Sequence, residues 1–105
     1  MVKLMYVITP KAGMSWVDFQ RYWLEVHAPI VKTIPHLKRY VINVSRLRPD
    51  GTSAGIAVAE QWFESLDAMK TALGTAEAKN ALDDIQKFAE VARTISGLVD
   101  EHIVV

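Results

Sequence analysis

Hydrophobic and polar residues alternate along several short segments of the chain, a pattern typical of β-strands with one buried face. Between these segments, apolar residues recur at intervals of three and four, which predicts helices. The predicted strands span 2–9, 37–46, 56–63 and 98–105, and the predicted helices span 16–33, 66–73 and 76–89. This order, β-α-β-β-α-β, predicts a ferredoxin-like α+β fold, with a four-stranded antiparallel sheet and its helices on one face.

The ends of the predicted helices coincide with residues that start or stop helices. Ser15, Ser65 and Thr75 each precede a helical pattern and are suited to accept a hydrogen bond from the first turn. Gly74 separates the second helix from the third. Pro35 favours an extended conformation at the residue before it, so the first helix should end by residue 33.

The first predicted helix has a proline inside it, close to a histidine. In a regular helix the apolar side chains share one face and His27 lies about 80° from Phe19, at the edge of that face. The buried positions would then be Trp16, Phe19, Trp23, Val26 and Ile30. Pro29 cannot donate a backbone hydrogen bond, so we expect a kink or a restart of the helix at Pro29 that leaves room beside the imidazole.

Both faces of the predicted sheet carry apolar side chains, although helices can cover only one of them. In the first strand Leu4 and Tyr6 point to one face, while Met5 and Val7 point to the other. The uncovered face needs a partner, and a second copy of the chain is the simplest one. We therefore expect a homodimer that forms through the sheet face, as a dimeric α/β barrel.

The composition narrows the possible classes of function. The 105 residues are enough for one domain, 1–105. Twelve Lys and Arg balance twelve Asp and Glu, so no net charge attracts nucleic acid or an anionic membrane. The third strand also lacks the alternating aromatics of RNA-recognition domains with the same element order. With no cysteine and no long apolar segment at the N-terminus, a cytoplasmic protein is expected.

Several segments resemble the EthD family, a branch of the dimeric α/β-barrel superfamily. The similar residues are the run FQRYWLEVHAP from Phe19 to Pro29, then Pro35, Tyr40 and Asn43, and later EQWF at 60–63 and Phe88-Ala89. The family position after Pro35 is more often glycine, whereas this chain has His36. Relatives in the superfamily include cofactor-independent monooxygenases, muconolactone isomerases, and decarboxylases or dehydratases of polycyclic aromatic compounds, so the resemblance implies the fold more directly than a reaction.

The resemblance also implies a ligand cleft between the sheet and the helices. His27 would be its catalytic residue, a general acid or base that needs no metal or cofactor. The residues expected to bind the substrate are Tyr22, Trp23, His36, Tyr40, Asn43, Trp62 and Phe88. Other interpretations remain open: His27 can be a structural histidine, Trp23 can belong to the core, and His36 can be a simple loop residue.

The remaining polar candidates favour structural roles. Glu60 interrupts an apolar strand, which predicts an ion pair with Lys38 or Arg39. His102 alternates with Asp100, a pattern typical of a solvated or intersubunit position. No spacing of histidines and carboxylates indicates a metal site, and we expect none.

We therefore expect a small cofactor-independent enzyme that acts on a hydrophobic aromatic or lactone-like metabolite, as an isomerase, a lyase or decarboxylase, or a monooxygenase. Two alternatives remain: a dimeric small-molecule-binding protein without catalysis, and a haem-handling member of the same superfamily.

Overall fold

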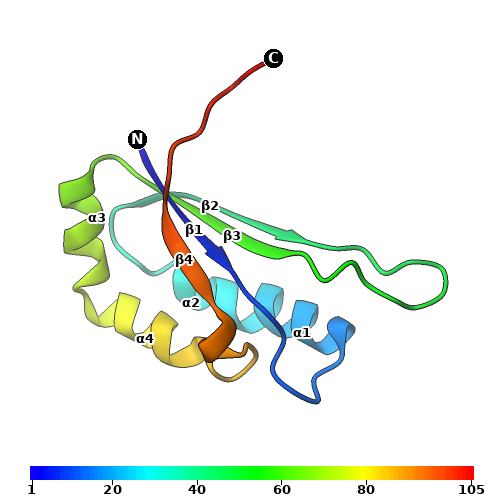
Figure 1. The fold of residues 1–105 in the computed structure, drawn as a ribbon. Coiled ribbons are helices and arrows are strands. Elements are labelled where there is room, and N and C mark those ends of the chain that lie inside the picture. Colours follow the sequence, from blue (N-terminus) through cyan, green and yellow to red (C-terminus); the bar gives the residue numbers. More distant parts are fainter.

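Four strands form one antiparallel sheet, and the helices lie against one of its faces (Figure 1). The computed structural model describes residues 1–105. The strands follow the order β2-β3-β1-β4 across the sheet, which is the ferredoxin-like topology. The elements are β1 (Val2–Val7), α1 (Trp16–Tyr22), η1 (Trp23–His27), α2 (Ala28–Val31), β2 (Leu37–Val44), β3 (Ala57–Phe63), α3 (Leu66–Leu73), α4 (Ala76–Ile85), η2 (Val91–Arg93) and β4 (Ile95–Val99).

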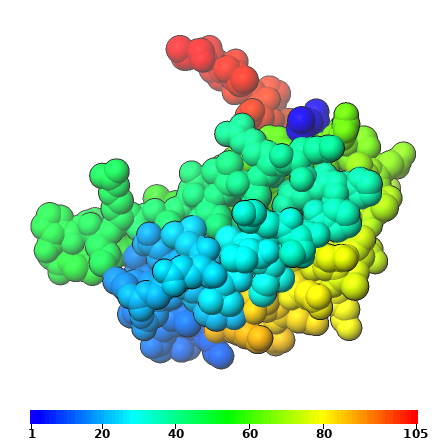
Figure 2. All heavy atoms as spheres, turned by 180° about the vertical axis from the view of Figure 1, so that it is seen from behind, coloured from blue at the N-terminus to red at the C-terminus, as the bar shows by residue number.

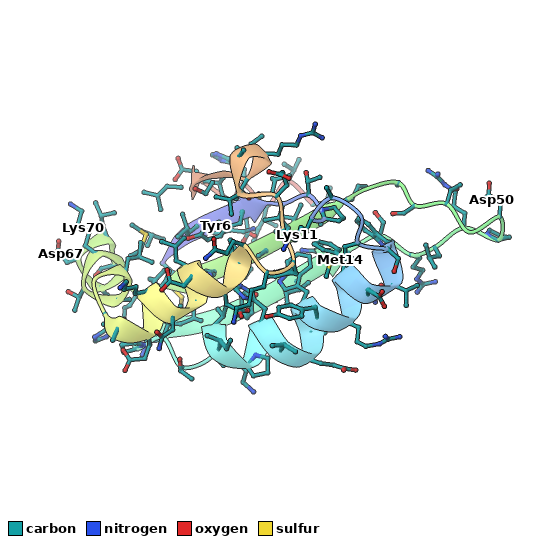
Figure 3. All side chains as sticks on the ribbon, turned by 90° about the horizontal axis from the view of Figure 1, so that it is seen from below. Tyr6, Lys11, Met14, Asp50, Asp67 and Lys70 are labelled. Atoms are coloured by element: carbon teal, nitrogen blue, oxygen red, sulfur yellow. The ribbon has the colours of Figure 1, made fainter.

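The predicted caps start the helices. The side chains of Ser15, Ser65 and Thr75 accept hydrogen bonds from backbone N–H groups three residues further along the chain. The first helical segment ends at Val31, before Pro35, as the sequence predicted. Seen from the helix side, α1, η1 and α2 form one rod that lies beside α4 across the sheet (Figure 3).

A new α-helical segment, α2, starts at Ala28 with Pro29 in its first turn, as the predicted restart requires. Before it, Trp23–His27 form a π-helical turn, and the backbone N–H of Ala28 donates to the carbonyl of Trp23, five residues back. A π turn is wider than an α turn, so each residue advances by a smaller rotation. His27 therefore takes the inward position that a regular helix would give to Val26. His27 is buried and Val26 is 43% exposed, which corrects the predicted order of these two side chains.

The core lies between the helices and the covered face of the sheet. The largest fully buried side chains are Trp23, Phe19, Phe63 and Phe88. On the central strand β3, the buried residues alternate with half-buried ones, so Ala57, Ala59, Gln61 and Phe63 face the helices. Tyr6 and Met14, both labelled in Figure 3, are partly buried and pack against this core.

The uncovered face of the sheet is less apolar than the sequence suggested. Lys3 forms an ion pair with Glu60 at 2.8 Å, and Asn43 donates to the same carboxylate at 2.9 Å. The predicted partners of Glu60, Lys38 and Arg39, were therefore wrong. The Arg39 guanidinium instead lies 4.7 Å from the centre of the Trp62 ring.

The last strand begins and ends earlier than predicted. β4 spans Ile95–Val99 and pairs with β1, whereas residues 100–105 form no strand. These terminal residues project from the body of the molecule (Figure 2). An apolar, β-forming sequence forms a strand only where a neighbouring strand offers free backbone hydrogen bonds. The antiparallel pairing of β4 with β1 runs from Ile95–Val7 to Val99–Lys3, so residues 100–105 extend past the N-terminal end of β1.

His36 occupies the turn before β2 with a backbone φ of 68°. In this left-handed region a side chain costs energy, whereas glycine enters it freely.

Candidate functional site

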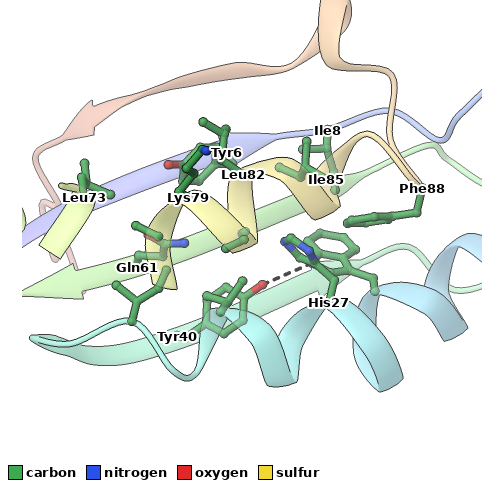
Figure 4. Close-up of a pocket in the computed structure, with 16 residues that line it drawn as sticks. Tyr6, Ile8, His27, Tyr40, Gln61, Leu73, Lys79, Leu82, Ile85 and Phe88 are labelled. Carbon is green, nitrogen blue, oxygen red and sulfur yellow. Dashed lines mark hydrogen bonds between the residues drawn. The ribbon is translucent and has the colours of Figure 1, made fainter. Parts of the chain in front are cut away.

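A cavity of about 370 Å³ lies between the covered face of the sheet and the helices (Figure 4). This volume is within the range of about 300–1,000 Å³ that is usual for small-molecule sites. Most of its 16 lining residues are hydrophobic: Tyr6, Ile8, Trp23, Val31, Ile34, Tyr40, Ala59, Leu73, Ala78, Ala81, Leu82, Ile85 and Phe88, joined by His27, Gln61 and Lys79.

Small residues leave the space that forms the cavity. Ala59 lies on β3, and Ala78 and Ala81 lie on the facing side of α4. The mouth of the cavity lies where its lining residues are exposed to solvent. These residues include Leu82, which is 65% exposed, and Lys79. The interior is therefore apolar and the rim includes one positive charge.

His27 is held against the side of the cavity by a carboxylate from α4. Its Nδ1 atom lies 2.9 Å from Oδ2 of Asp84, and both residues are only 4% exposed. Tyr22 donates from its hydroxyl to the other oxygen of Asp84 at 2.8 Å. The ring of Phe88 packs on the imidazole with centroids 4.7 Å apart. These contacts determine the orientation of the imidazole.

The protonation states follow from burial and these hydrogen bonds. Burial lowers the pKa of His27 below its ordinary 6.5, and the hydrogen bond with Asp84 opposes this only in part. Burial also acts to raise the pKa of Asp84, but the hydrogen bonds from His27 and Tyr22 outweigh it, so this pKa lies below its usual 3.8. A neutral imidazole beside a carboxylate must donate from Nδ1–H. Nε2 then carries a free lone pair and has no partner in the protein.

Two tyrosines add hydroxyl groups to the cavity. Trp23 donates from Nε1 to the hydroxyl oxygen of Tyr40 at 3.3 Å, so the proton of Tyr40 remains available to a ligand. Burial raises the pKa of Tyr40 to about 12, and burial also raises the pKa of Tyr6. Both hydroxyls therefore stay protonated at neutral pH and can act as hydrogen-bond donors.

One buried polar atom in the cavity has no partner. Gln61 is 6% exposed, and no group of the protein donates to its Oε1 atom. Nearly all buried polar atoms in folded proteins are paired with protein groups or water, so this oxygen can accept a hydrogen bond from a molecule in the cavity.

The structure brings together some of the residues that the sequence pointed to and separates others. Trp23, His27, Tyr40 and Phe88 line the cavity. Tyr22 lies behind it, where it contacts Asp84 and stacks on Phe88.

Three of the predicted contact residues do not reach the cavity. Asn43 and Trp62 lie on the uncovered face of the sheet, because each alternates with residues that face the helices. His36 is exposed in the turn before β2.

Asp84 and Gln61 were missed, although each had a signal in the sequence. Asp84 falls three residues after Ala81 and four before Phe88, which places it on the apolar stripe of the helix. Gln61 falls in the alternation of Ala57, Ala59 and Phe63, at a position that should be apolar. A polar residue at a buried position needs a partner. The partners of Asp84 were not evident from the sequence, and Oε1 of Gln61 has none in the structure.

No three His, Cys, Asp or Glu side chains come together as a metal site would require. None of the helices has the length and apolar character needed to span a bilayer.

Comparison with known proteins places these features in a family. The family model described as "EthD domain" matches residues 11–92, a range that contains His27, Gln61 and Asp84. A solved EthD family protein from Bacillus halodurans has a TM-score of 0.76 and 20% identity, with 97% of this chain and 100% of that chain covered.

Two further structures share the fold. SnoaB, a cofactor-independent oxygenase from Streptomyces nogalater, has a TM-score of 0.65 and 16% identity, with 98% of this chain and 94% of that chain covered. A dimeric ferredoxin-like protein of unknown function from Thermobifida fusca has a TM-score of 0.68 and 12% identity, with 93% of this chain and 88% of that chain covered. At such identities the likeness shows a common fold.

Proposed function

The chain belongs to the EthD family, and from this starting point we propose that it is a small cofactor-independent enzyme of apolar, aromatic or lactone-like metabolites, with His27 as its general base. The reaction class is proton transfer at an acidic carbon or hydroxyl, the step with which an isomerisation, an elimination or a cofactor-independent oxygenation can begin. One of the structural relatives is described as a cofactor-independent oxygenase.

The observation that supports this proposal best is the position of His27 between a buried carboxylate and an apolar cavity. Asp84 accepts from Nδ1 and leaves the Nε2 lone pair as the base that faces the ligand. A carboxylate that orients a histidine in this way also stabilises the imidazolium that forms when the base takes a proton. The lowered pKa of His27 keeps the base neutral, and therefore active, at neutral pH.

The proton transfer can be followed atom by atom for a ketone ligand. Nε2 of His27 takes a proton from the carbon next to the carbonyl, and the electron pair of that C–H bond moves to the oxygen as an enolate. The Tyr40 hydroxyl donates a hydrogen bond to this oxygen, since its own oxygen already accepts from Trp23. Return of the proton at the same or another carbon completes an exchange or an isomerisation.

We further propose a homodimer through the uncovered face of the sheet. Met5 and Val7 of β1 and the exposed Ile95 of β4 lie on this face, where a second sheet can cover them. A dimeric relative of the same fold supports this arrangement. The polar cluster of Lys3, Glu60 and Asn43 would then be desolvated, and its members already satisfy one another.

The base can be tested without knowledge of the natural substrate. 2-Tetralone is an apolar bicyclic ketone with acidic hydrogens, and NMR in D₂O follows their exchange for deuterium. The wild-type protein should accelerate this exchange, and His27→Gln should reduce the acceleration by about 10²–10⁴-fold. His36→Gln is the matched control, because His36 lies outside the cavity.

Equal exchange rates for His27→Gln and the wild type would contradict the role of the base. If 2-tetralone binds in the cavity with no acceleration of exchange by the wild type, the result favours a binding protein without catalysis. A Soret band in the purified protein would instead support the haem-handling alternative.

A further inference from the structure

Gln61 lies in the middle of the sheet, and no neighbouring group pairs with its Oε1 atom. Gln61 is on β3, and its Cα partners are Leu4 on β1 and Tyr40 on β2. Leu4 offers no polar group, and the hydroxyl of Tyr40, which accepts from Trp23, makes no hydrogen bond to Gln61. The residues that line the cavity from α4 include Ala78 and Ala81, which have no polar side-chain atoms, and Lys79, which does not donate to Gln61. Figure 4 shows the amide end of Gln61 on the cavity side of β3.

An apolar residue would be more stable at this position in the absence of a ligand. A buried polar atom without a partner costs about 1–3 kcal/mol. The neighbours on the same face of the strand, Ala59 and Phe63, are apolar, so the local pattern also favours an apolar side chain. Gln61 therefore has a cost in the free protein that a ligand in the cavity can remove.

We propose that Oε1 of Gln61 accepts a hydrogen bond from a hydroxyl or ring N–H of the ligand, and so selects aromatic ligands that carry such a donor; this rests on the function proposed above. The cavity then presents three different groups to one small molecule. Oε1 of Gln61 accepts, the hydroxyl of Tyr40 donates, and Nε2 of His27 takes a proton. A hydroxylated aromatic ketone satisfies this set, because its hydroxyl donates to Gln61, its carbonyl oxygen accepts from Tyr40, and an acidic C–H bond beside the carbonyl gives its proton to His27. A plain hydrocarbon leaves all three groups unpaired.

The test compares two probes that differ by one methyl group, which replaces the donor proton. 2-Naphthol has a hydroxyl group, and 2-methoxynaphthalene keeps the oxygen but has no proton to donate. Their dissociation constants are measured by calorimetry for the wild type and for Gln61→Met, which preserves the length of the side chain without its polar atoms. For each protein, the dissociation constant of 2-methoxynaphthalene is divided by that of 2-naphthol. Comparing this ratio between the wild type and Gln61→Met cancels the difference in hydration between the probes.

We expect the wild type to favour 2-naphthol, relative to Gln61→Met, by a factor of about 5–100. Gln86→Met is the matched control, because Gln86 is exposed and lies outside the cavity, and it should leave the preference unchanged. Thermal unfolding of the ligand-free proteins provides a second readout. Gln61→Met should melt at the same temperature as the wild type or higher, since it removes an unpaired buried atom.

The outcomes separate this inference from the proposed function. If both probes bind and Gln61→Met changes their affinities by the same factor, the role of Gln61 is wrong while the ligand cavity stands. If neither probe binds to the wild type, the apolar ligand site itself is wrong, and the inference fails with it. If Gln61→Met melts several degrees lower, Oε1 has a partner within the protein and is not reserved for a ligand.

Discussion

Replacement of Asp84 by Asn tests the centre of the site, because it keeps the shape of the side chain and removes its charge. The carboxylate accepts two hydrogen bonds, from His27 at 2.9 Å and from Tyr22 at 2.8 Å. An asparagine has one carbonyl oxygen and one NH₂ group, so it cannot accept from both donors in the same way. Either one hydrogen bond is lost, or one partner must become the acceptor.

The expected loss of stability can be worked out from these contacts. A hydrogen bond to a charged group contributes about 1.5–3 kcal/mol and a neutral one about 0.5–1.5 kcal/mol, so Asp84→Asn either loses one bond or weakens both. The free energy of unfolding should therefore fall by about 1.5–3 kcal/mol, a large share of the 5–15 kcal/mol that is usual for a domain. Asp84→Ala removes both acceptors, so about 3–6 kcal/mol is expected and the variant can fail to fold.

The substitution should also move a proton on His27. If the NH₂ group of the new asparagine faces Nδ1, this nitrogen must accept, and the imidazole proton moves to Nε2. The lone pair that faces the cavity is then lost, as is the base. Exchange of 2-tetralone should consequently fall toward the rate of His27→Gln, although the imidazole is still present.

Two measurements check these expectations. Urea unfolding at equal protomer concentration gives the stability, with Asp83→Asn as the control, since Asp83 is the adjacent exposed carboxylate on the same helix. Two-bond ¹⁵N–¹H NMR correlations identify the protonated nitrogen of His27. A stability within about 0.5 kcal/mol of wild type, or a wild-type His27 with its proton on Nε2, would refute the Asp84–His27 arrangement.

The other predictions concern pH, a strained turn and the uncovered face. In the folded protein the pKa of His27 lies below 6.5, so on acidification the unfolded chain binds a proton at this histidine before the folded protein does. The free energy of unfolding should therefore decrease progressively as the pH falls below about 6.5. Urea unfolding at pH values from 7 down to 5 should show this decrease, and His27→Gln should make the free energy of unfolding depend less steeply on pH. A wild type that becomes more stable from pH 7 to pH 5, while His27→Gln does not, would contradict the prediction. His36→Gly should raise the free energy of unfolding by up to about 1 kcal/mol, because glycine relieves the positive φ of 68° but is more flexible when unfolded; a loss greater than this would show that the His36 side chain makes a stabilising contact. Val7→Asp should yield a monomer in sedimentation experiments while leaving the circular dichroism spectrum unchanged, because Val7 is 41% exposed on the uncovered face; a wild type that is already monomeric at micromolar concentration would contradict the dimer.

The sequence by itself was enough to predict the elements whose causes are local. The alternation of β1 and β3, the caps at Ser15, Ser65 and Thr75, and the stop before Pro35 depend on neighbouring residues only. The element order then restricts the topology to a few possibilities, and the FQRYWLEVHAP run pointed to the family. His27 could be identified as a candidate because it lies beside Pro29 within the apolar pattern.

The tertiary structure alone decided what lies next to His27. Asp84 is 57 positions away along the chain, so no local pattern connects the two residues. The π turn also changed the rotation of the helix, and a regular geometry of 100° per residue therefore assigned the inward position to Val26 instead of His27. The last strand was misplaced for a similar reason, since a strand forms only where a neighbouring strand can pair with it.

The candidate site therefore divides into two parts. The kinds of residue that chemistry needs, an imidazole and an apolar surface, can be read from the sequence because they are properties of single residues and short segments. The protonation of that imidazole, and the lack of a partner for Gln61, depend on burial and on groups from α4, β2 and β3 that meet only in the folded chain. A hydrogen bond needs its two groups within a few ångströms of each other, whatever their separation in the sequence. Only the tertiary structure therefore decided which groups are paired.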